Sequence, residues 1–290
     1  MASPLRVGLL GAGPWAKMAT GPVLAAGPET AVTGVWSRTG AHADELAAQL
    51  HTNAFATVDA LFDACDAVAI AVAPATQPVL AVRAANAGKA LLLEKPLGAD
   101  VTGAAAVVEA VHANGVGALV MLSNRFHSAL DDFITAAGLA EPIGGRGSFV
   151  SGAFLGGPYA YGWRLERGAV LDVGPHLLDL LEAGLGEIID VHAAGDPLGW
   201  VSLVCRHASG VTSSGALCCS AAGDGGTEVV VYGRHANAHY NGSHVDYDAW
   251  PARVRRDFAG VARGATHPAS VDHAFHLQQL IAEIESQLSE

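Results

Sequence analysis

Two side chains that could move a proton, Asp172 and His176, stand four residues apart in the sequence. Positions four apart on a helix share one face, so this carboxylate comes within reach of the imidazole. Such a carboxylate can fix the imidazole tautomer and leave the other ring nitrogen to exchange a proton with a substrate hydroxyl. Pro175 and the leucines after it predict that a helix starts here. A histidine at a helix start can equally be structural, so the pair alone leaves both interpretations open.

A candidate electrostatic group, Lys95, follows the apolar run Ala90–Leu93 in the segment Glu94-Lys95-Pro96. At the carboxyl end of a parallel strand, a lysine can donate a hydrogen bond to a substrate oxygen and place positive charge beside a developing alkoxide. The alternative is a surface lysine paired with Glu94. Lys95 is therefore a candidate whose role depends on what lies beside it.

A glycine-rich turn, Gly11–Ala16, follows the apolar run Leu5–Leu10 and opens a predicted helix. The pattern G-x-G-x-x-A at a strand-to-helix turn is typical of dinucleotide sites. Gly11 permits the tight turn, Gly13 lets the main chain approach phosphate, and Ala16 allows the helix to pack closely on the strand. The helix N-terminus adds N–H groups and partial positive charge for a pyrophosphate. The turn, with its central Pro14 and Trp15, is predicted to bind a dinucleotide.

The second predicted strand ends at Trp36 and is followed by Ser37 and Arg38. An acidic residue at this place would accept hydrogen bonds from the ribose 2′-hydroxyl of NAD, whereas a hydroxyl and a guanidinium suit the 2′-phosphate of NADP. An exposed arginine that tolerates either cofactor is the alternative. The sequence favours NADP(H) and keeps NAD(H) open.

The elements that would position these groups fall into two regions of different texture. Apolar runs alternate with helical stretches through residues 1–122, and runs that are apolar throughout suit a parallel sheet covered on both faces. From residue 123 on, strands joined by Gly- and Asp-containing turns predict a mainly antiparallel, open sheet with one wet face. We therefore expect an α/β chain: a doubly wound Rossmann domain at 1–122 and an α+β domain with a mainly antiparallel, open sheet at 123–290. A crevice between them would lie beside the carboxyl ends of the parallel strands.

The first region contains the predicted strands Leu5–Leu10, Ala31–Trp36, Ala67–Val72, Ala90–Leu93 and Gly117–Leu122, and the predicted helices Ala41–Leu50, Gln77–Ala87 and Val101–Asn114. The second contains the predicted strands Gly147–Phe154, Val191–Ala194, Trp200–Arg206, Val211–Cys219 and Glu228–Tyr232, and the predicted helices Pro175–Leu185 and Val271–Leu288.

Composition excludes several classes of partner. With 51% hydrophobic and 15% charged residues, the chain is typical of a compact globular protein. A net charge of −12 leaves no basic surplus for nucleic acid or an anionic membrane. There is no uninterrupted apolar stretch of about 18 residues, so no membrane span is expected. The four cysteines lack metal-site spacing, which favours reduced thiols and a cytoplasmic location.

Two further groups of residues have open roles. Tyr159, Tyr161 and Trp163 precede the Asp172 segment and could line a sugar site by stacking, or pack in the core. Histidines recur in a polar, Gly- and Asn-rich stretch, but spaced surface histidines seldom bind metal, and no metal is expected. These are His235, His239 and His244.

Several motifs together resemble the glucose-fructose oxidoreductase / inositol dehydrogenase / rhizopine catabolism (Gfo/Idh/MocA) family. Besides the glycine turn, Ala87–Leu97 is similar to the family's AGK-x-VL-x-EKPL segment. Asn124-Arg125-Phe126 resembles the start of its second domain. Trp163-Arg164, followed by Leu171-Asp172-x-Gly174-x-His176-x-x-Asp179, resembles its D-x-G-x-H-x-x-D motif. The resemblance covers almost the whole chain.

The resemblance implies an NAD(P)-dependent dehydrogenase or reductase acting on CH–OH groups of sugars, polyols or related hydroxy and keto compounds. It implies that His176 exchanges the proton, that Asp172 orients or tunes it, and that Lys95 positions the reacting oxygen near the nicotinamide. It also implies a cis Lys95-Pro96 bond. A redox-neutral NAD-dependent glycosidase and a non-catalytic nucleotide sensor of the same fold remain alternatives, and the retained catalytic set argues against the sensor.

This chain departs from the family pattern at a few positions. Where the family often has T-P and a downstream His, the chain has Ala73-Pro74 and Gln77. We expect Ala73 and Gln77 on the cofactor side, with Glu94 and Lys95. The expected substrate residues are Lys95, Arg125, Tyr159, Trp163, Asp172 and His176. The expected partner is a small molecule. The chain is shorter than many relatives, so a homo-oligomer through the C-terminal sheet stays open.

Overall fold

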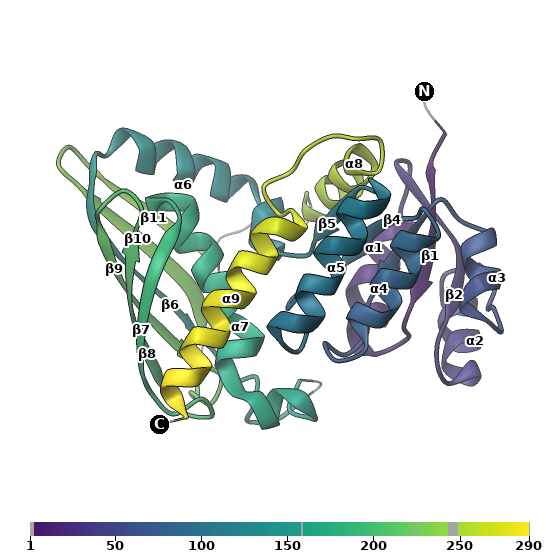
Figure 1. Ribbon diagram of the computed structural model, residues 1–290, viewed down its shortest axis with the longest axis horizontal. Helices are drawn as coiled ribbons and strands as arrows, with labels where there is room; N and C mark the ends of the chain where they lie inside the picture. The colour runs from purple at the N-terminus through teal and green to yellow at the C-terminus, as the bar shows by residue number, and fades with distance from the viewer. Residues whose placement is uncertain (1–2, 158, 224, 243–248, 290) are drawn as a thin grey trace. The chain divides into compact units, whose positions relative to one another are not determined.

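The computed structural model describes residues 3–157, 159–223, 225–242 and 249–289 (Figure 1). The chain forms two compact units, one of Met1–Met121 with Asp248–Phe275 and one of Leu122–Tyr247 with His276–Glu290. The sequence places the domain boundary one residue later, after residue 122. It also assigns the whole C-terminal part to the second domain, whereas a segment of that part returns to the first unit.

The sheet of the first unit has five parallel strands in the order β2-β1-β3-β4-β5. β3 and β4 are buried along their whole length, as a parallel sheet covered on both faces requires. The chain passes from β1 to one side and then returns to place β3 on the other, so a topological switch point lies between them. The strands are β1 Leu5–Leu10, β2 Thr30–Trp36, β3 Ala67–Ile70, β4 Ala90–Leu93 and β5 Ala118–Val120, which confirms the predicted strands to within a residue or two at their ends.

The predicted helices of this unit are confirmed as α2 Gly40–Gln49, α4 Gln77–Asn86 and α5 Val101–Asn114. The bounds of α5 follow from its two caps. The Asp100 side chain accepts a hydrogen bond from the Gly103 N–H at 2.8 Å, and Gly115 ends the helix with a left-handed φ of 60°.

The glycine turn leads into a helical stretch of unusual form. A π-helical segment, η1 Ala16–Thr20, continues directly into the short helix α1 Gly21–Ala25. Such π segments recur at functional sites. A further short helix, α3 Val58–Asp63, was not predicted, although Thr57 caps it by accepting from the Ala60 N–H at 3.2 Å.

The helix α8, Trp250–Val261, explains why a C-terminal segment belongs to the first unit. Its buried face includes Val254 and Phe258, and it packs against β2, β5 and α1. Arg255, which is 7% exposed, pairs with Glu29 at 2.9 Å. These partners lie far apart in the sequence, so local periodicity carries no sign of this return.

The second unit is built on a six-stranded sheet in the order β11-β10-β6-β9-β8-β7. All neighbouring pairs are antiparallel except β6 and β9, which confirms a mainly antiparallel sheet. Along β8, buried and exposed residues alternate strictly, as expected of a sheet with one wet face. The strands are β6 Pro142–Val150, β7 Ile188–Gly195, β8 Val201–His207, β9 Thr212–Cys218, β10 Gly226–Gly233 and β11 Asn237–Asn241.

The prediction that a helix begins at Pro175 is wrong. The helix α7 spans Trp163–Leu185, and Pro175 lies inside it. Its one break is Gly168, with φ 77° and ψ −168°, where a Cβ would clash with the carbonyl oxygen of Pro197. The segment 168–181 is buried throughout, so tertiary burial outweighs the hydrogen bond that the proline removes.

Two more helices complete this part of the fold. α6 Ser128–Leu139 packs against β11 and α7, and α7 itself packs against β6, β9 and β10. The predicted C-terminal helix is confirmed as α9 Val271–Leu288. In the described part of the chain, no helix is long and apolar enough to span a membrane.

Candidate active site

The glycine turn has the tight shape predicted from its glycines. Gly11 has a φ of 111°, and its N–H donates to the Trp36 carbonyl at 2.8 Å. A Cβ at Gly11 would clash with the carbonyl of Ala71, just beyond β3, so only glycine fits between the strand ends. At Gly13 a Cβ would meet no atom within 4 Å, and Ala16 is fully buried. The exposed main chain at Gly13 therefore opens onto free space, and its contact with a pyrophosphate stays a prediction.

The loop that carries Lys95 is bound to this turn through the carboxylate before it. The Trp15 indole N–H donates to Glu94 Oε1 at 2.7 Å, and the Thr20 hydroxyl donates to the same oxygen at 3.4 Å. The donors lie on the helical stretch after the glycines, and Glu94 directly follows β4. Lys95, which is half-buried, therefore lies one residue from a direct contact with the predicted dinucleotide turn.

The main chain of the same loop is bound by Gln77, the first residue of α4. Its Nε2 lies 2.7, 3.0 and 3.2 Å from the carbonyl oxygens of Glu94, Pro96 and Leu97. Its Oε1 accepts from the Glu94 N–H at 2.9 Å. The Lys95-Pro96 peptide bond is cis. The sequence predicts cofactor contact for Gln77, but the structure shows its amide engaged by the loop.

The residues predicted to select the cofactor lie between β2 and α2. Ser37 is half-buried and Arg38 is exposed. The first turn of α2 carries no acidic residue, and Thr39 at its N-cap makes no side-chain capping bond. Ala73, the remaining predicted cofactor residue, is exposed after β3, and its carbonyl accepts from the Gln77 N–H at 3.1 Å.

The predicted proton-transfer pair lies in the buried part of α7. Asp172 and His176 are 5% and 7% exposed and stand one helical turn apart, so they share a face of the helix. The ring of Phe149, from β6, lies 5.9 Å from the His176 ring between centroids. Asp172 also accepts a hydrogen bond from Arg164 Nε at 3.2 Å. The carboxylate is thus oriented from across the Gly168 break.

Arg164 is a residue to which the sequence assigned no role. Its guanidinium carbon lies 4.5 Å from the Trp163 ring centroid and 5.4 Å from that of Tyr159. Two of the aromatic residues predicted to line a substrate site therefore surround the arginine that holds Asp172, while Tyr161 is 48% exposed. Because the helix is broken at Gly168, helical spacing does not connect positions 164 and 172. The sequence therefore could not reveal the contact between Arg164 and Asp172.

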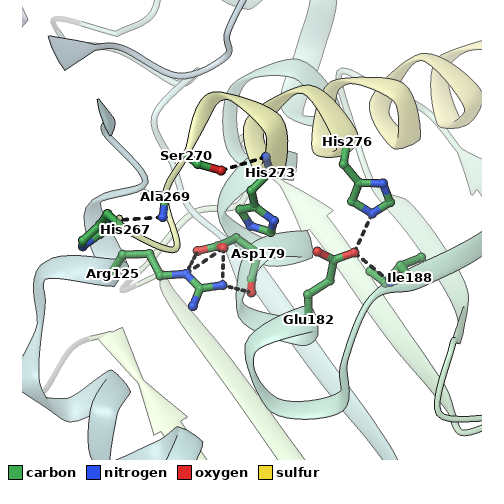
Figure 2. A network of polar contacts seen from close by, with 9 residues as sticks. All are labelled: Arg125, Asp179, Glu182, Ile188, His267, Ala269, Ser270, His273 and His276. Carbon is green, nitrogen blue, oxygen red and sulfur yellow. Dashed lines mark hydrogen bonds and ion pairs between the residues drawn. The ribbon is translucent and has the colours of Figure 1, made fainter. Parts of the chain in front are cut away.

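Arg125, predicted as a substrate residue, forms a buried ion pair with Asp179 (Figure 2). Its Nη2 lies 2.6 Å from Asp179 Oδ1, and its Nε lies 2.8 and 3.0 Å from the two carboxylate oxygens. The side chains are 11% and 1% exposed. A contact between Arg125 and a substrate stays a prediction.

The candidate residues are divided between the units. Lys95 and the predicted cofactor residues belong to the first, and Asp172, His176 and Arg125 belong to the second. The described residues contain no group of three or more His, Cys, Asp or Glu arranged to hold a metal ion. His244 lies outside the described residues.

Two curated proteins resemble this chain in sequence. One is dTDP-3,4-didehydro-2,6-dideoxy-alpha-D-glucose 3-reductase of Streptomyces violaceoruber, 30% identical over 198 residues, which cover 66% of this chain and 57% of that protein. The other is D-apiose dehydrogenase of Paraburkholderia graminis, 32% identical over 162 residues, which cover 51% of this chain and 42% of that protein. The chain thus spans only about half the length of these relatives.

In fold, the chain resembles GenD2 from gentamicin A biosynthesis, solved in complex with NAD. The TM-score is 0.87 at 19% identity, covering 100% of this chain and 95% of that one. Residues 5–122 match the model of the Gfo/Idh/MocA oxidoreductase family, described as an NAD-binding Rossmann fold. The likeness to this family model is carried by the first part of the chain, from β1 to the end of the parallel sheet.

Proposed function

We propose that the protein transfers a hydride between a nicotinamide cofactor, preferably NADP(H), and a hydroxyl or keto carbon of a sugar, polyol or related compound. The observation that carries this proposal is the hydrogen bond of 2.7 Å between Trp15 and Glu94. It ties the loop of Lys95 to the predicted dinucleotide turn, which supports a role for this lysine near the cofactor. The names of the two curated relatives, a sugar reductase and a sugar dehydrogenase, support the substrate class.

The cofactor would be held by residues of the first unit alone. The main chain of Gly11–Ala16 would bind the pyrophosphate, because Gly13 opens onto free space there. Ser37 and Arg38 would bind a 2′-phosphate, since no carboxylate in the first turn of α2 opposes it. Ala73, Glu94 and Lys95 would lie toward the nicotinamide, which when bound supplies or accepts the hydride.

The proton and the reacting oxygen would each be handled by a polar side chain. His176 would exchange it with the substrate oxygen, in the manner of a general acid–base whose contribution is typically about 10²–10⁴-fold. Asp172 would orient the imidazole, and Arg164 holds that carboxylate in place. Lys95 would donate a hydrogen bond to the reacting oxygen and stabilise negative charge on it. Tyr159, Trp163 and Arg125 are the proposed substrate contacts.

A fluorescence titration with NADPH and with NADH, followed by a panel of sugars and keto-sugars, tests this function. We expect tighter binding of NADPH and a steady change in nicotinamide absorbance with at least one compound. His176→Ala should keep cofactor binding and lose turnover. Product formation without any net change in nicotinamide absorbance would instead indicate a redox-neutral reaction and overturn the proposal.

A further inference from the structure

We propose that Gln77 is the positioning residue of Lys95: its side-chain amide holds the main chain of the Glu94–Leu97 loop and thereby aims the lysine. This inference rests on the proposed function, since it assigns Gln77 a part in the same reaction. It also replaces the cofactor contact that the sequence predicts for this residue.

Both N–H donors of the Gln77 amide are used within the protein. Its Nε2 carries two N–H donors, and three carbonyl oxygens lie within 3.2 Å of it. Its Oε1 accepts from the Glu94 N–H at 2.9 Å. The residue is 1% exposed. No donor of this amide is left for a ligand, so donating a hydrogen bond to a cofactor would require breaking a bond to the loop.

The loop needs such a partner because it leaves the sheet. β4 ends at Leu93, so the carbonyls of Pro96 and Leu97 lie beyond the strand. Pro96 and Leu97 are buried, and a buried carbonyl without a partner costs about 1–3 kcal/mol. Gln77 satisfies the carbonyls on both sides of Lys95 from one rigid point, the first residue of α4. The path of the main chain through Lys95 is therefore set by this side chain.

A second contact, between Trp15 and the Glu94 carboxylate, holds the same loop. Glu94 is held at its main chain by Gln77 and at its carboxylate by Trp15, at 2.7 Å. Lys95 follows directly, so its Cα has little freedom to move. Two contacts therefore connect the lysine loop to its surroundings. The Gln77 amide binds the main chain of the loop, and the Glu94 carboxylate binds Trp15 in the glycine turn.

Two substitutions separate positioning from other roles. Gln77→Ala removes every bond of the amide. Gln77→Glu keeps the shape of the side chain and an acceptor for the Glu94 N–H. When it is ionised, however, the new carboxylate has no proton to donate to the carbonyl oxygens of the loop and is repelled by them. When protonated, the introduced carboxyl can again donate to one of them, as the amide does. The control is Gln49→Ala, because the amide of Gln49 also bonds one carbonyl, that of Lys17 at 3.2 Å, but in an exposed position.

Steady-state kinetics and cofactor titrations then decide between the roles. We expect Gln77→Ala to lower kcat by about tenfold to hundredfold, as small misplacements of reacting groups do, with cofactor affinity unchanged. We expect the activity of Gln77→Glu, relative to the parent at the same pH, to rise as the pH falls. Gln49→Ala should behave as the parent. Weakened cofactor binding with kcat unchanged would show a cofactor ligand, and a pH-independent activity ratio for Gln77→Glu would also overturn the proposal.

A measurement without turnover keeps this inference apart from the proposed function. The indole N–H resonance of Trp15, assigned with Trp15→Phe, reports the hydrogen bond to Glu94 in the full-length protein. We expect this resonance to shift in Gln77→Ala and in ionised Gln77→Glu, and to stay in place in Gln49→Ala. If the parent reduced no substrate, the proposed function would fail while this shift still supported the attachment. An unshifted resonance in both Gln77 variants would overturn the attachment itself.

Discussion

Arg164 donates a hydrogen bond to the carboxylate of Asp172 at 3.2 Å, across the break that Gly168 makes in α7. Both side chains are largely buried, at 16% and 7% exposure. The guanidinium is itself held against the Trp163 ring, 4.5 Å from its centroid. The orientation of Asp172 therefore depends on a residue that precedes the break.

The first prediction concerns this pair. We expect Arg164→Ala to lower kcat by about tenfold to hundredfold without weakening cofactor binding, because Asp172 loses the group that orients it. Arg164→Lys should recover only part of the loss, since it keeps the charge but not the planar fork. The matched control is Arg167→Ala, on the same helix as Arg164, which breaks a more exposed pair with Glu285 of α9. Equal kinetics for the Arg164 and Arg167 variants would contradict the role of Arg164.

The second prediction concerns the buried ion pair between Arg125 and Asp179. Arg125→Met should lower the free energy of unfolding by about 3–5 kcal/mol, because it removes the arginine that pairs with a buried carboxylate. Adding Asp179→Leu to that variant should recover much of the loss. Urea unfolding followed by circular dichroism measures both effects. A double variant as unstable as the single one would show that the pair is not the cause.

The third prediction concerns cofactor choice. Arg38→Ala should weaken NADPH binding by about tenfold to hundredfold, since a hydrogen bond to a charged group contributes about 1.5–3 kcal/mol, and should leave NADH binding unchanged. Ser37→Asp should favour NADH by supplying a carboxylate for the ribose hydroxyls. Fluorescence titrations with both cofactors measure this. Parallel losses for NADPH and NADH in Arg38→Ala would argue against a 2′-phosphate contact.

The fourth prediction concerns the pH dependence of stability. The hydrogen bond to the Glu182 carboxylate, at 2.7 Å, raises the pKa of His276 above its ordinary 6.5, while burial partly opposes the shift (Figure 2). Because the folded state binds this proton more tightly, the stabilisation is complete below about pH 6.5 and is lost as the pH rises through the raised pKa. Glu182 also accepts from the Ile188 N–H at 2.7 Å, so its position does not depend on His276 alone.

Unfolding curves of the parent and of His276→Gln at several pH values measure this effect. The difference in unfolding free energy between the two should be largest at acidic pH and should shrink toward alkaline pH. His192→Gln is the control, because His192 is 74% exposed beside Asp190 and should contribute little at any pH. A difference that grew with pH would contradict the predicted sign.

The sequence predicts those helices and strands whose ends are marked by nearby residues, such as a capping side chain or a glycine. β1 ends where Gly11 turns the chain, and α5 lies between the cap at Asp100 and the glycine at 115. The same signals mislead at Pro175, which resembles a helix start. There the burial of the surrounding residues carries the helix past the proline. The path of α8 back to the first unit has no local signal, since Arg255 and Glu29 are 226 residues apart.

The candidate site divides in the same way. Its residue types and spacings identify Lys95, Asp172 and His176 as candidates, but not the residues that orient them. The partner of the Glu94 carboxylate, Trp15, is 79 positions away, and Gln77 is 17 positions away. Such contacts follow from the order of strands in the sheet, because the carboxyl ends of the parallel strands β1 and β4 lie on the same side of it. The periodicity of the sequence does not give the order of the strands.

Hydride transfer to or from a carbon of the substrate can be followed by isotope transfer from the cofactor. The protein would be incubated with NADPH deuterated at the transferable position of the nicotinamide and with the panel of keto-sugars, and the products would be analysed by mass spectrometry. We predict that deuterium appears on the carbon that becomes the alcohol, in step with cofactor oxidation, and that His176→Ala abolishes this transfer. A product that forms without deuterium and without cofactor oxidation would contradict the account.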